Sequence, residues 1–181
     1  MTRSLLAIVL SKTPKCTKWV KPVGDFLKVN CDAAFDQATS SGGWEFIIRD
    51  VDGDVVGAGG GRLVHLMDPL HAETIACLQG AQAAADMGIG RVISETDAAM
   101  ARNAVLSNDS DLLPVGNLVA ELKYVLCLNF VEFYVNNVPR ECNKVAHALA
   151  AWGRDVQMDE DPIVGSLPSC IQAIGRRSCG I

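Results

Sequence analysis

The sequence has no long apolar run. Residues 5–10 form a stretch of six apolar side chains, but Lys12 follows closely and no clear cleavage site comes after it. A transmembrane helix needs about 18 or more such residues, and a secretory signal needs a cleavage site behind its apolar region. We therefore expect a protein that does not span a membrane, is not secreted, and works in the nucleus or cytoplasm.

A cysteine framework is also missing. The chain has seven cysteines, an odd number, and no two of them have C-x-x-C spacing. This pattern argues against a disulfide-stabilised fold and against a zinc site, and favours reduced thiols inside the cell.

The body of the chain has no strongly basic region. Residues 1–25 hold five basic side chains and one acidic side chain, whereas residues 26–153 hold eight and sixteen, a balance of −8. The whole chain has a formal net charge of −5. A domain that binds nucleic acid tightly on its own usually presents a basic face. We therefore do not expect tight, autonomous binding by residues 26–153.

Several catalytic and binding motifs are incomplete. His71-Ala-Glu73 matches the H-x-E of zinc deaminases, but no P-C-x-x-C follows to supply thiolate ligands. The acids at 50, 52 and 54 begin like a calcium loop, but Gly53 is misplaced and Gly61 stands where the loop needs glutamate. The glycines at 57–61 do not complete a dinucleotide-binding motif, and no phosphate-binding loop is present.

What the sequence does contain is apolar material for one ordinary domain. Hydrophobic residues make up 49% of the 181 positions, enough to fill a core. We predict an irregular basic segment at residues 1–25, a folded domain at 26–153, and a loosely ordered tail at 154–181. A monomer is expected.

Periodicity predicts an antiparallel meander followed by alternating strands and helices. Residues 26–35 alternate apolar and polar side chains, and Asp52-Gly53 is a hairpin signal between two further strands. Asp68-Pro69 begins a helix with a stripe of small residues that would let it lie close to a sheet. The predicted strands are 26–35, 44–49, 55–64, 91–96 and 130–135, and the predicted helices follow residue 69 and span 98–106, 115–128 and 141–152. This order fits an α/β fold with one mixed sheet and helices packed on it.

Three carboxylates stand out from these elements. Asp32 lies in an apolar strand, where the plain alternative is an edge-strand acid facing solvent. Glu73 begins the small-residue stripe of its helix, and Asp97 ends a strand, where it could instead cap the next helix. Neighbouring carboxylates repel and raise one another's pKa, and a divalent metal is the usual compensation. The three acids therefore predict a metal-dependent nuclease.

Two polar residues share one face of the last predicted helix. Asn143 and His147 are four positions apart, beside apolar positions expected to pack inward. A histidine at the edge of an apolar stripe is more often structural than a ligand.

With these segments in order, the chain resembles the ribonuclease H family, and most closely the plant reverse-transcriptase-like ribonuclease H type-1 domains. The resemblance covers roughly residues 19–153, and six matching pieces occur in the expected order. They are 19–24 (WVKPVG), 27–35 (LKVNCDAAF), 48–56 (IRDVDGDVV), 71–76 (HAETIA), 92–97 (VISETD) and 138–150 (VPRECNKVAHALA).

The resemblance implies a five-stranded mixed sheet, its first three strands antiparallel, with helices on both faces. It implies hydrolysis of the RNA strand of an RNA–DNA hybrid with two Mg²⁺ ions, for which Mn²⁺ could substitute. By the resemblance, Asp32, Glu73 and Asp97 would bind the metals, and His147 would stand where the family has its fourth acid. The same resemblance makes Asn143 a candidate substrate-binding residue.

The chain departs from the family pattern in three places. His147 replaces an acid, Ala33-Ala34 follows Asp32 where many relatives have Gly-Ser, and Glu45 replaces a glycine usual in the second strand. Two alternatives stay open beside an active hybrid nuclease. One is a catalytically decayed, retroelement-derived domain that binds nucleic acid or protein without turnover, and the other is a related nuclease or integrase acting on DNA. A tethering protein could supply the nucleic-acid affinity that the acidic domain lacks.

Overall fold

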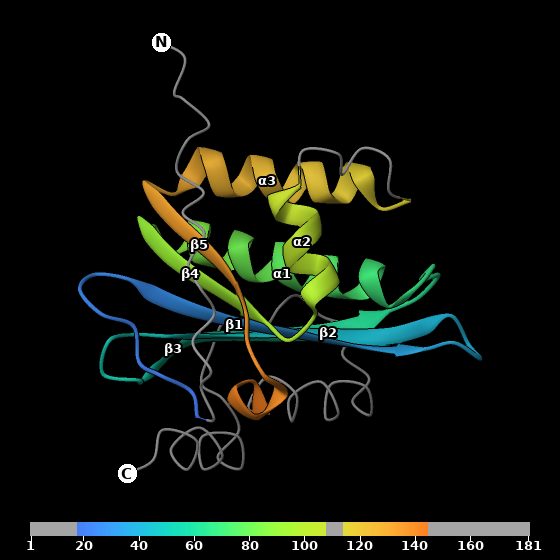
Figure 1. Cartoon of the computed structure of the whole chain (residues 1–181), viewed down its shortest axis with the longest axis horizontal. Helices are drawn as coiled ribbons and strands as arrows, with labels where there is room; N and C mark the ends of the chain where they lie inside the picture. Colours follow the sequence, from blue (N-terminus) through green and yellow to red (C-terminus); the bar gives the residue numbers. More distant parts are fainter. Residues whose placement is uncertain (1–17, 108–113, 145–181) are drawn as a thin grey trace.

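The computed structural model describes residues 18–107 and 114–144, which form one five-stranded sheet with helices packed on it (Figure 1). The strands are β1 (Leu27–Asp36), β2 (Ser41–Arg49), β3 (Val55–Leu63), β4 (Arg91–Thr96) and β5 (Glu132–Asn137). Their order across the sheet is β3-β2-β1-β4-β5, so β1 is the central strand. The predicted α/β architecture with a mixed sheet is confirmed.

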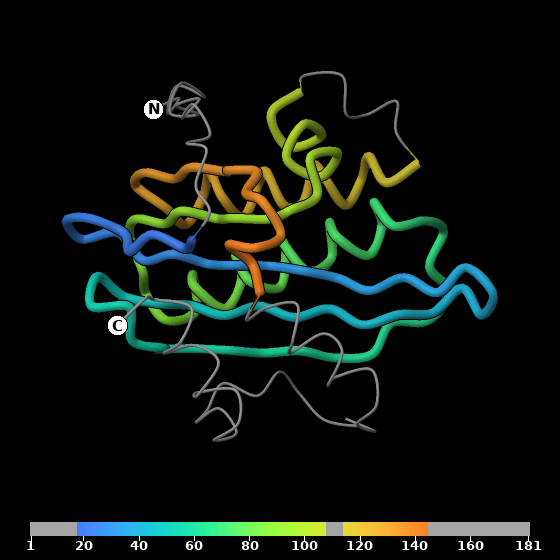
Figure 2. Tube along the Cα trace, turned by 60° about the horizontal axis from the view of Figure 1, so that its bottom comes forward, coloured from blue at the N-terminus to red at the C-terminus, as the bar shows by residue number. Residues whose placement is uncertain are grey.

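The sheet has an antiparallel half and a parallel half. The hairpins join β1, β2 and β3 in antiparallel pairs, and these strands run side by side in Figure 2. On the other side of β1, β4 lies parallel to it and β5 lies parallel to β4. The central strand is therefore the place where the direction of strand pairing changes.

Strand β2 begins earlier than predicted. The sequence predicted this strand at residues 44–49, but it already starts at Ser41. A Cβ atom at position 42 would lie 1.9 Å from the backbone oxygen of Ala34 on β1. Gly42 thus allows two paired strands to approach closely, and the turn is confined to the residues before Ser41.

Helix α1 (Pro69–Asp86) starts where the sequence predicts. The Asp68 side chain accepts a 2.8 Å hydrogen bond from the His71 backbone N–H, and proline occupies the first turn, where no intrahelical donor is needed. After the helix, Gly88 has a φ of +72°, a left-handed conformation that glycine adopts without steric cost. Both ends of α1 are therefore set by local sequence.

The small residues of α1 bring it against the sheet, as predicted. A Cβ atom at Gly80 would lie 2.8 Å from Cγ1 of Val29 and 2.9 Å from Sγ of Cys31. A larger residue at position 80 would push the helix away from β1. The main core gathers around this contact, and it includes Phe46, Ile48, Ala76, Cys77, Ala81, Ala84, Val92, Leu122, Leu126 and Phe133.

Two further helices complete the layer beside α1. Helix α3 (Gly116–Asn129) packs on α1, and both lie on the same side of the sheet (Figure 1). The shorter α2 (Ala99–Leu106) joins them through a small cluster of apolar side chains. The buried members of this cluster are Leu70, Ala101, Ala104, Val115 and Val119.

The last predicted helix, at 141–152, lies mostly beyond the described residues. A single 3₁₀ turn, η2 (Arg140–Cys142), follows β5, and Asn143 comes directly after it. Residues 145–152 are outside the described ranges, and so is His147. Within those ranges no helix combines the length and the apolarity that a membrane span requires.

The second face of the sheet is polar, yet it is buried at its centre. Lys28, Asn30 and Asp32 alternate along β1 with the apolar core residues, as predicted, but all three side chains are buried. Because β1 is the central strand, the interpretation of Asp32 as an edge-strand acid facing solvent is wrong.

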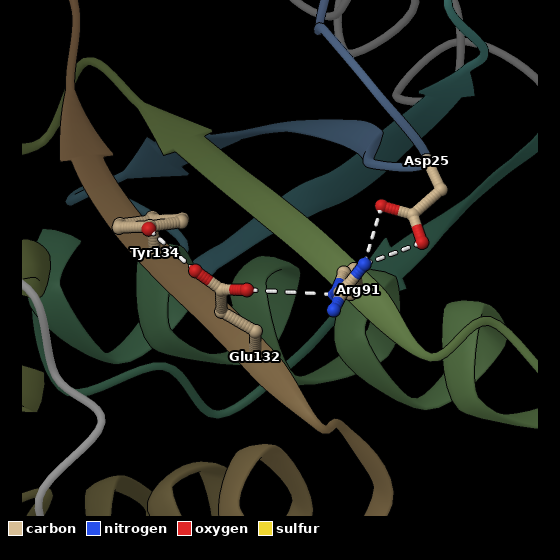
Figure 3. A network of polar contacts seen from close by, with 4 residues as sticks. All are labelled: Asp25, Arg91, Glu132 and Tyr134. Atoms are coloured by element: carbon tan, nitrogen blue, oxygen red, sulfur yellow. Dashed lines mark hydrogen bonds and ion pairs between the residues drawn. The ribbon is translucent and has the colours of Figure 1, made fainter.

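A different polar network lies exposed at the start of β4 and β5. The Arg91 guanidinium binds Asp25 at 2.6 Å and Glu132 at 3.4 Å, and the Tyr134 hydroxyl bonds to Glu132 (Figure 3). These side chains connect the chain ahead of β1 to the far edge of the sheet.

Candidate metal centre

The candidate centre begins where the parallel pair β1 and β4 separates. The pairing of these strands ends at Cys31 opposite Thr96. Asp32 follows Cys31, and Asp97 follows Thr96. In open α/β sheets, ligands bind beyond the carboxyl ends of the strands, at the point where the strand order reverses. Both acids stand at this point.

Helix α1 contributes the third acid. Glu73 lies at the start of the second turn of α1, and one of its oxygens accepts a 3.4 Å hydrogen bond from the Thr96 hydroxyl. The backbone of Ala33 also hydrogen-bonds to Glu73. The carboxylate is thus held between β1 and the end of β4.

The three acids predicted from the sequence meet in space. Asp32, Glu73 and Asp97 each offer a carboxylate oxygen, and these oxygens all lie within 4.8 Å of one another. Asp32 is only 3% exposed, and the other two are half-buried. Burial, followed by the charges of Asp32 and Asp97, raises the pKa of Glu73 to about 8. Such a group of oxygen ligands suits a hard divalent cation.

Asp97 does not have the capping role that competed with a metal-binding role. Helix α2 is preceded by Ala98, and no side chain caps its N-terminus. The nearby Ala98 backbone N–H donates instead to the Thr96 hydroxyl at 3.0 Å. The capping interpretation of Asp97 is therefore wrong. Its carboxylate lies beside those of Asp32 and Glu73.

A fourth carboxylate in this region was missed as a site residue. Glu45 on β2 stands directly opposite Asp32 in the antiparallel pairing, and it is 1% exposed. Burial first, and then the charges of Asp32, Glu73 and Asp97, raise the pKa of Glu45 to about 11. The signal in the sequence was the register of the first hairpin, which places residues 32 and 45 on one face of the sheet.

Asn143 lies close to this centre. Its side-chain amide donates a 2.8 Å hydrogen bond to the backbone oxygen of Cys31, the residue before Asp32, and the side chain is 1% exposed. This bond ties the chain after η2 to the middle of β1. The predicted substrate-binding role of Asn143 stays a prediction, as does the role of His147.

Comparison with protein families supports a relationship over most of the chain. The sequence profile of the family described as reverse transcriptase-like matches residues 30–153. None of the curated proteins matches the sequence.

Solved structures of RNase H enzymes share the fold. RNase H1 from Halobacterium salinarum NRC-1 has a TM-score of 0.64 and 22% identity, covering 72% of this chain and 98% of its own. The N-terminal RNase H domain of a Mycobacterium tuberculosis protein has a TM-score of 0.66 and 16% identity, over 73% and 95% of the two chains. LC11-RNase H1 in complex with an RNA/DNA hybrid has a TM-score of 0.65 and 14% identity, over 71% and 96%.

Proposed function

The chain belongs to the reverse transcriptase-like family and contains an RNase H-like domain, and from this premise we propose that it is a metal-dependent ribonuclease. Its reaction would be hydrolysis of the RNA strand of an RNA–DNA hybrid. The observation that carries the proposal is the meeting of Asp32, Glu73 and Asp97, whose carboxylate oxygens lie within 4.8 Å of one another.

The donor set fits the proposed Mg²⁺ ions. Asp32, Glu73 and Asp97 would hold them, because Mg²⁺ is bound in proteins through a few carboxylates together with water and substrate phosphates. When bound, a pair of such ions activates water and stabilises the leaving oxygen in phosphodiester hydrolysis. Mn²⁺, which prefers similar ligands, would support the same reaction.

The residues of the chain itself prepare this centre. Asp32 is fixed by the central strand, and its Oδ1 accepts a 3.1 Å bond from the Ala33 backbone N–H. Thr96 and the Ala33 backbone hold the Glu73 carboxylate. Because these contacts come from a sheet and a long helix, the acids would keep their geometry before substrate arrives.

Nucleic acid is the proposed partner. The structural neighbours include an RNase H1 solved with an RNA/DNA hybrid and a foamy viral protease-reverse transcriptase solved with double-stranded DNA. Since residues 26–153 carry a balance of −8, most of the phosphate attraction would come from residues 1–25, with a balance of +4, or from a tethering protein.

The decisive experiment is cleavage of a labelled RNA–DNA hybrid in Mg²⁺, in Mn²⁺ and in EDTA. The parent protein should cleave only with metal, and Asp32→Asn should lower the rate by about 1,000-fold or more, since metal stabilisation contributes several kcal/mol to the barrier. Asp52→Asn is the matched control, because Asp52 is exposed in the turn between β2 and β3.

A third variant tests the departure at the fourth acid. If His147→Asp cleaves faster than the parent, the missing acid limits catalysis. Equal rates for the parent and Asp32→Asn, or no cleavage by any variant, would remove the proposal.

A non-catalytic domain is the second candidate function. Glu45, where the family usually has glycine, favours it because this residue adds a buried acidic side chain directly opposite Asp32. Binding of the hybrid without turnover in either metal would support this candidate, whereas turnover would exclude it.

A further inference from the structure

Glu45 is a buried glutamate whose carboxyl group has no partner in the part of the chain that the structure describes. Both of its carboxylate oxygens are buried, and neither has a hydrogen-bond partner within residues 18–107 and 114–144. Buried polar side chains are nearly always hydrogen-bonded, so an exception of this kind needs an explanation. Removing an unpaired carboxylate from water costs far more than any packing that its two methylene groups provide.

A second glutamate on the same face shows how this fold satisfies a buried carboxylate. Glu95 on β4 binds Lys28 Nζ at 2.8 Å with one oxygen and accepts from the Asn30 amide at 2.9 Å with the other. Each oxygen of Glu95 therefore has a partner from the neighbouring strand. Glu45 is buried to a similar degree but has neither a cation nor an amide from the described residues.

The neighbours of Glu45 in the sheet direct it toward the candidate centre. On one side stands Asp32 of β1, and on the other stands Gly60 of β3, which has no side chain. Directly opposed residues in an antiparallel pair have Cβ atoms about 4.5–5.5 Å apart and point to the same face. The carboxyl groups of Glu45 and Asp32 are thus adjacent, and Gly60 provides no side-chain donor to Glu45.

We propose that Glu45 is a fourth carboxylate of the metal centre, supplied by β2, and that it binds a divalent cation together with Asp32. The inference rests on the proposed function, because it needs the cation site of Asp32, Glu73 and Asp97. Glu45 lies beside the set of three oxygens that meet within 4.8 Å, rather than in it. Because Glu45 faces Asp32 from the neighbouring strand, it would offer a further oxygen ligand to a divalent cation held by Asp32.

Direct measurement of Mn²⁺ binding tests this proposal without reference to catalysis. Electron paramagnetic resonance of free Mn²⁺ in a titration gives both the affinity and the number of bound ions. The titrated proteins are the parent, Glu45→Gln, Glu45→Asp and Asp32→Asn. The matched control is Glu121→Gln, because Glu121 is an exposed glutamate on α3.

A ligand role predicts a graded loss of affinity. Glu45→Gln keeps the size of the side chain and removes its charge, so its Kd for Mn²⁺ should rise at least tenfold. Glu45→Asp keeps the charge but shortens the side chain by one methylene, so its Kd should rise less. Glu121→Gln should bind as the parent does. A purely structural glutamate would change the unfolding midpoint in EDTA and leave the Mn²⁺ affinity as it was.

Two results would overturn the inference, and they are distinguishable. If Glu45→Gln binds Mn²⁺ as the parent does while Asp32→Asn has lost binding, Glu45 is not a ligand and the proposed function stands. If the parent itself binds no Mn²⁺, the inference and the proposed function fail together. Should Glu45→Gln not fold, as judged by circular dichroism, Glu45→Asp decides, and parent-like affinity there overturns the inference.

Discussion

The two ends of β1 differ in the buried charged side chains that lie around them. At the start of the strand, Lys28 pairs with Glu95, and both side chains are 7% exposed. At the other end, Asp32 and Glu45 stand together, and Glu73 and Asp97 add two more carboxylates. These residues lie around one central strand, so the difference does not come from the fold as a whole. At the start of β1 a buried acid is paired with a buried cation, whereas at its other end four acidic side chains gather in one place.

The start of β1, where Lys28 pairs with Glu95, also has a second cation nearby. The Arg49 guanidinium lies 4.4 Å from the centre of the Trp19 ring, and Lys28 Nζ lies 5.2 Å from the same ring. Aromatic faces attract such cations, so Trp19 stabilises both of them. Lys28 and Asp32 are four positions apart on β1, a distance of roughly 13 Å, so the cations at one end make no contact with the acids at the other.

The largest expected effect comes from removing the cation at the start of β1. Lys28→Met should lower the free energy of unfolding by about 3–5 kcal/mol, because it leaves Glu95 buried with no cation. Urea unfolding measures the change. The double variant Lys28→Met/Glu95→Gln should recover much of the loss, and the exposed Lys144→Met should change little. A small effect of Lys28→Met would mean that the two ends of β1 do not differ as described.

An intermediate effect is expected from pH at the acidic end. The raised pKa values of Glu73, about 8, and Glu45, about 11, mean that the folded protein holds protons that the unfolded chain releases near pH 4.5. The stability of the metal-free protein should therefore fall as pH rises from about 4.5 to 8, and Glu45 continues the fall above pH 8. Each such proton contributes roughly 1.4 kcal/mol per pH unit.

Urea unfolding in EDTA at several pH values checks this slope. Glu45→Gln removes one of the two titrating groups, so its stability should fall less steeply with pH than that of the parent. Stability that rises between pH 5.5 and 8 in the metal-free parent would contradict the arrangement of unbalanced acids.

The smallest effect is expected at the exposed network of Figure 3. Asp25→Asn removes the 2.6 Å partner of Arg91, but the two side chains are 68% and 40% exposed, so water and salt screen their attraction. The midpoint of urea unfolding should stay close to that of the parent. A loss comparable to that of Lys28→Met would show that exposure does not separate the two kinds of ion pair in this protein.

Local sequence was sufficient for much of the fold. The alternation along residues 26–35 predicted β1, and Asp68-Pro69 predicted the start of α1, because strand periodicity and helix caps are properties of neighbouring residues. The early start of β2 was not predicted, because the role of Gly42 is a close approach to Ala34 on another strand. That role depends on pairing, which a single segment does not reveal.

The candidate site, too, was predicted only in part from the sequence. The family motifs predicted that Asp32, Glu73 and Asp97 would converge, although no local pattern links these positions. Glu45 was noticed only as a departure from the family, since its position opposite Asp32 requires the register of the hairpin and its burial requires the assembled sheet. The bond from Asn143 to Cys31 spans 112 positions and was equally out of reach.

The place where β1 and β4 separate also has a kinetic consequence. The acids stand one residue beyond a parallel ladder that runs from Leu27 to Cys31 on β1, so their mutual repulsion acts on strands that are already hydrogen-bonded to their neighbours. Such a scaffold would keep the acids in place if the proposed metal ions were removed. If the proposed metal binds there, its binding and release would need no rearrangement of the backbone of β1.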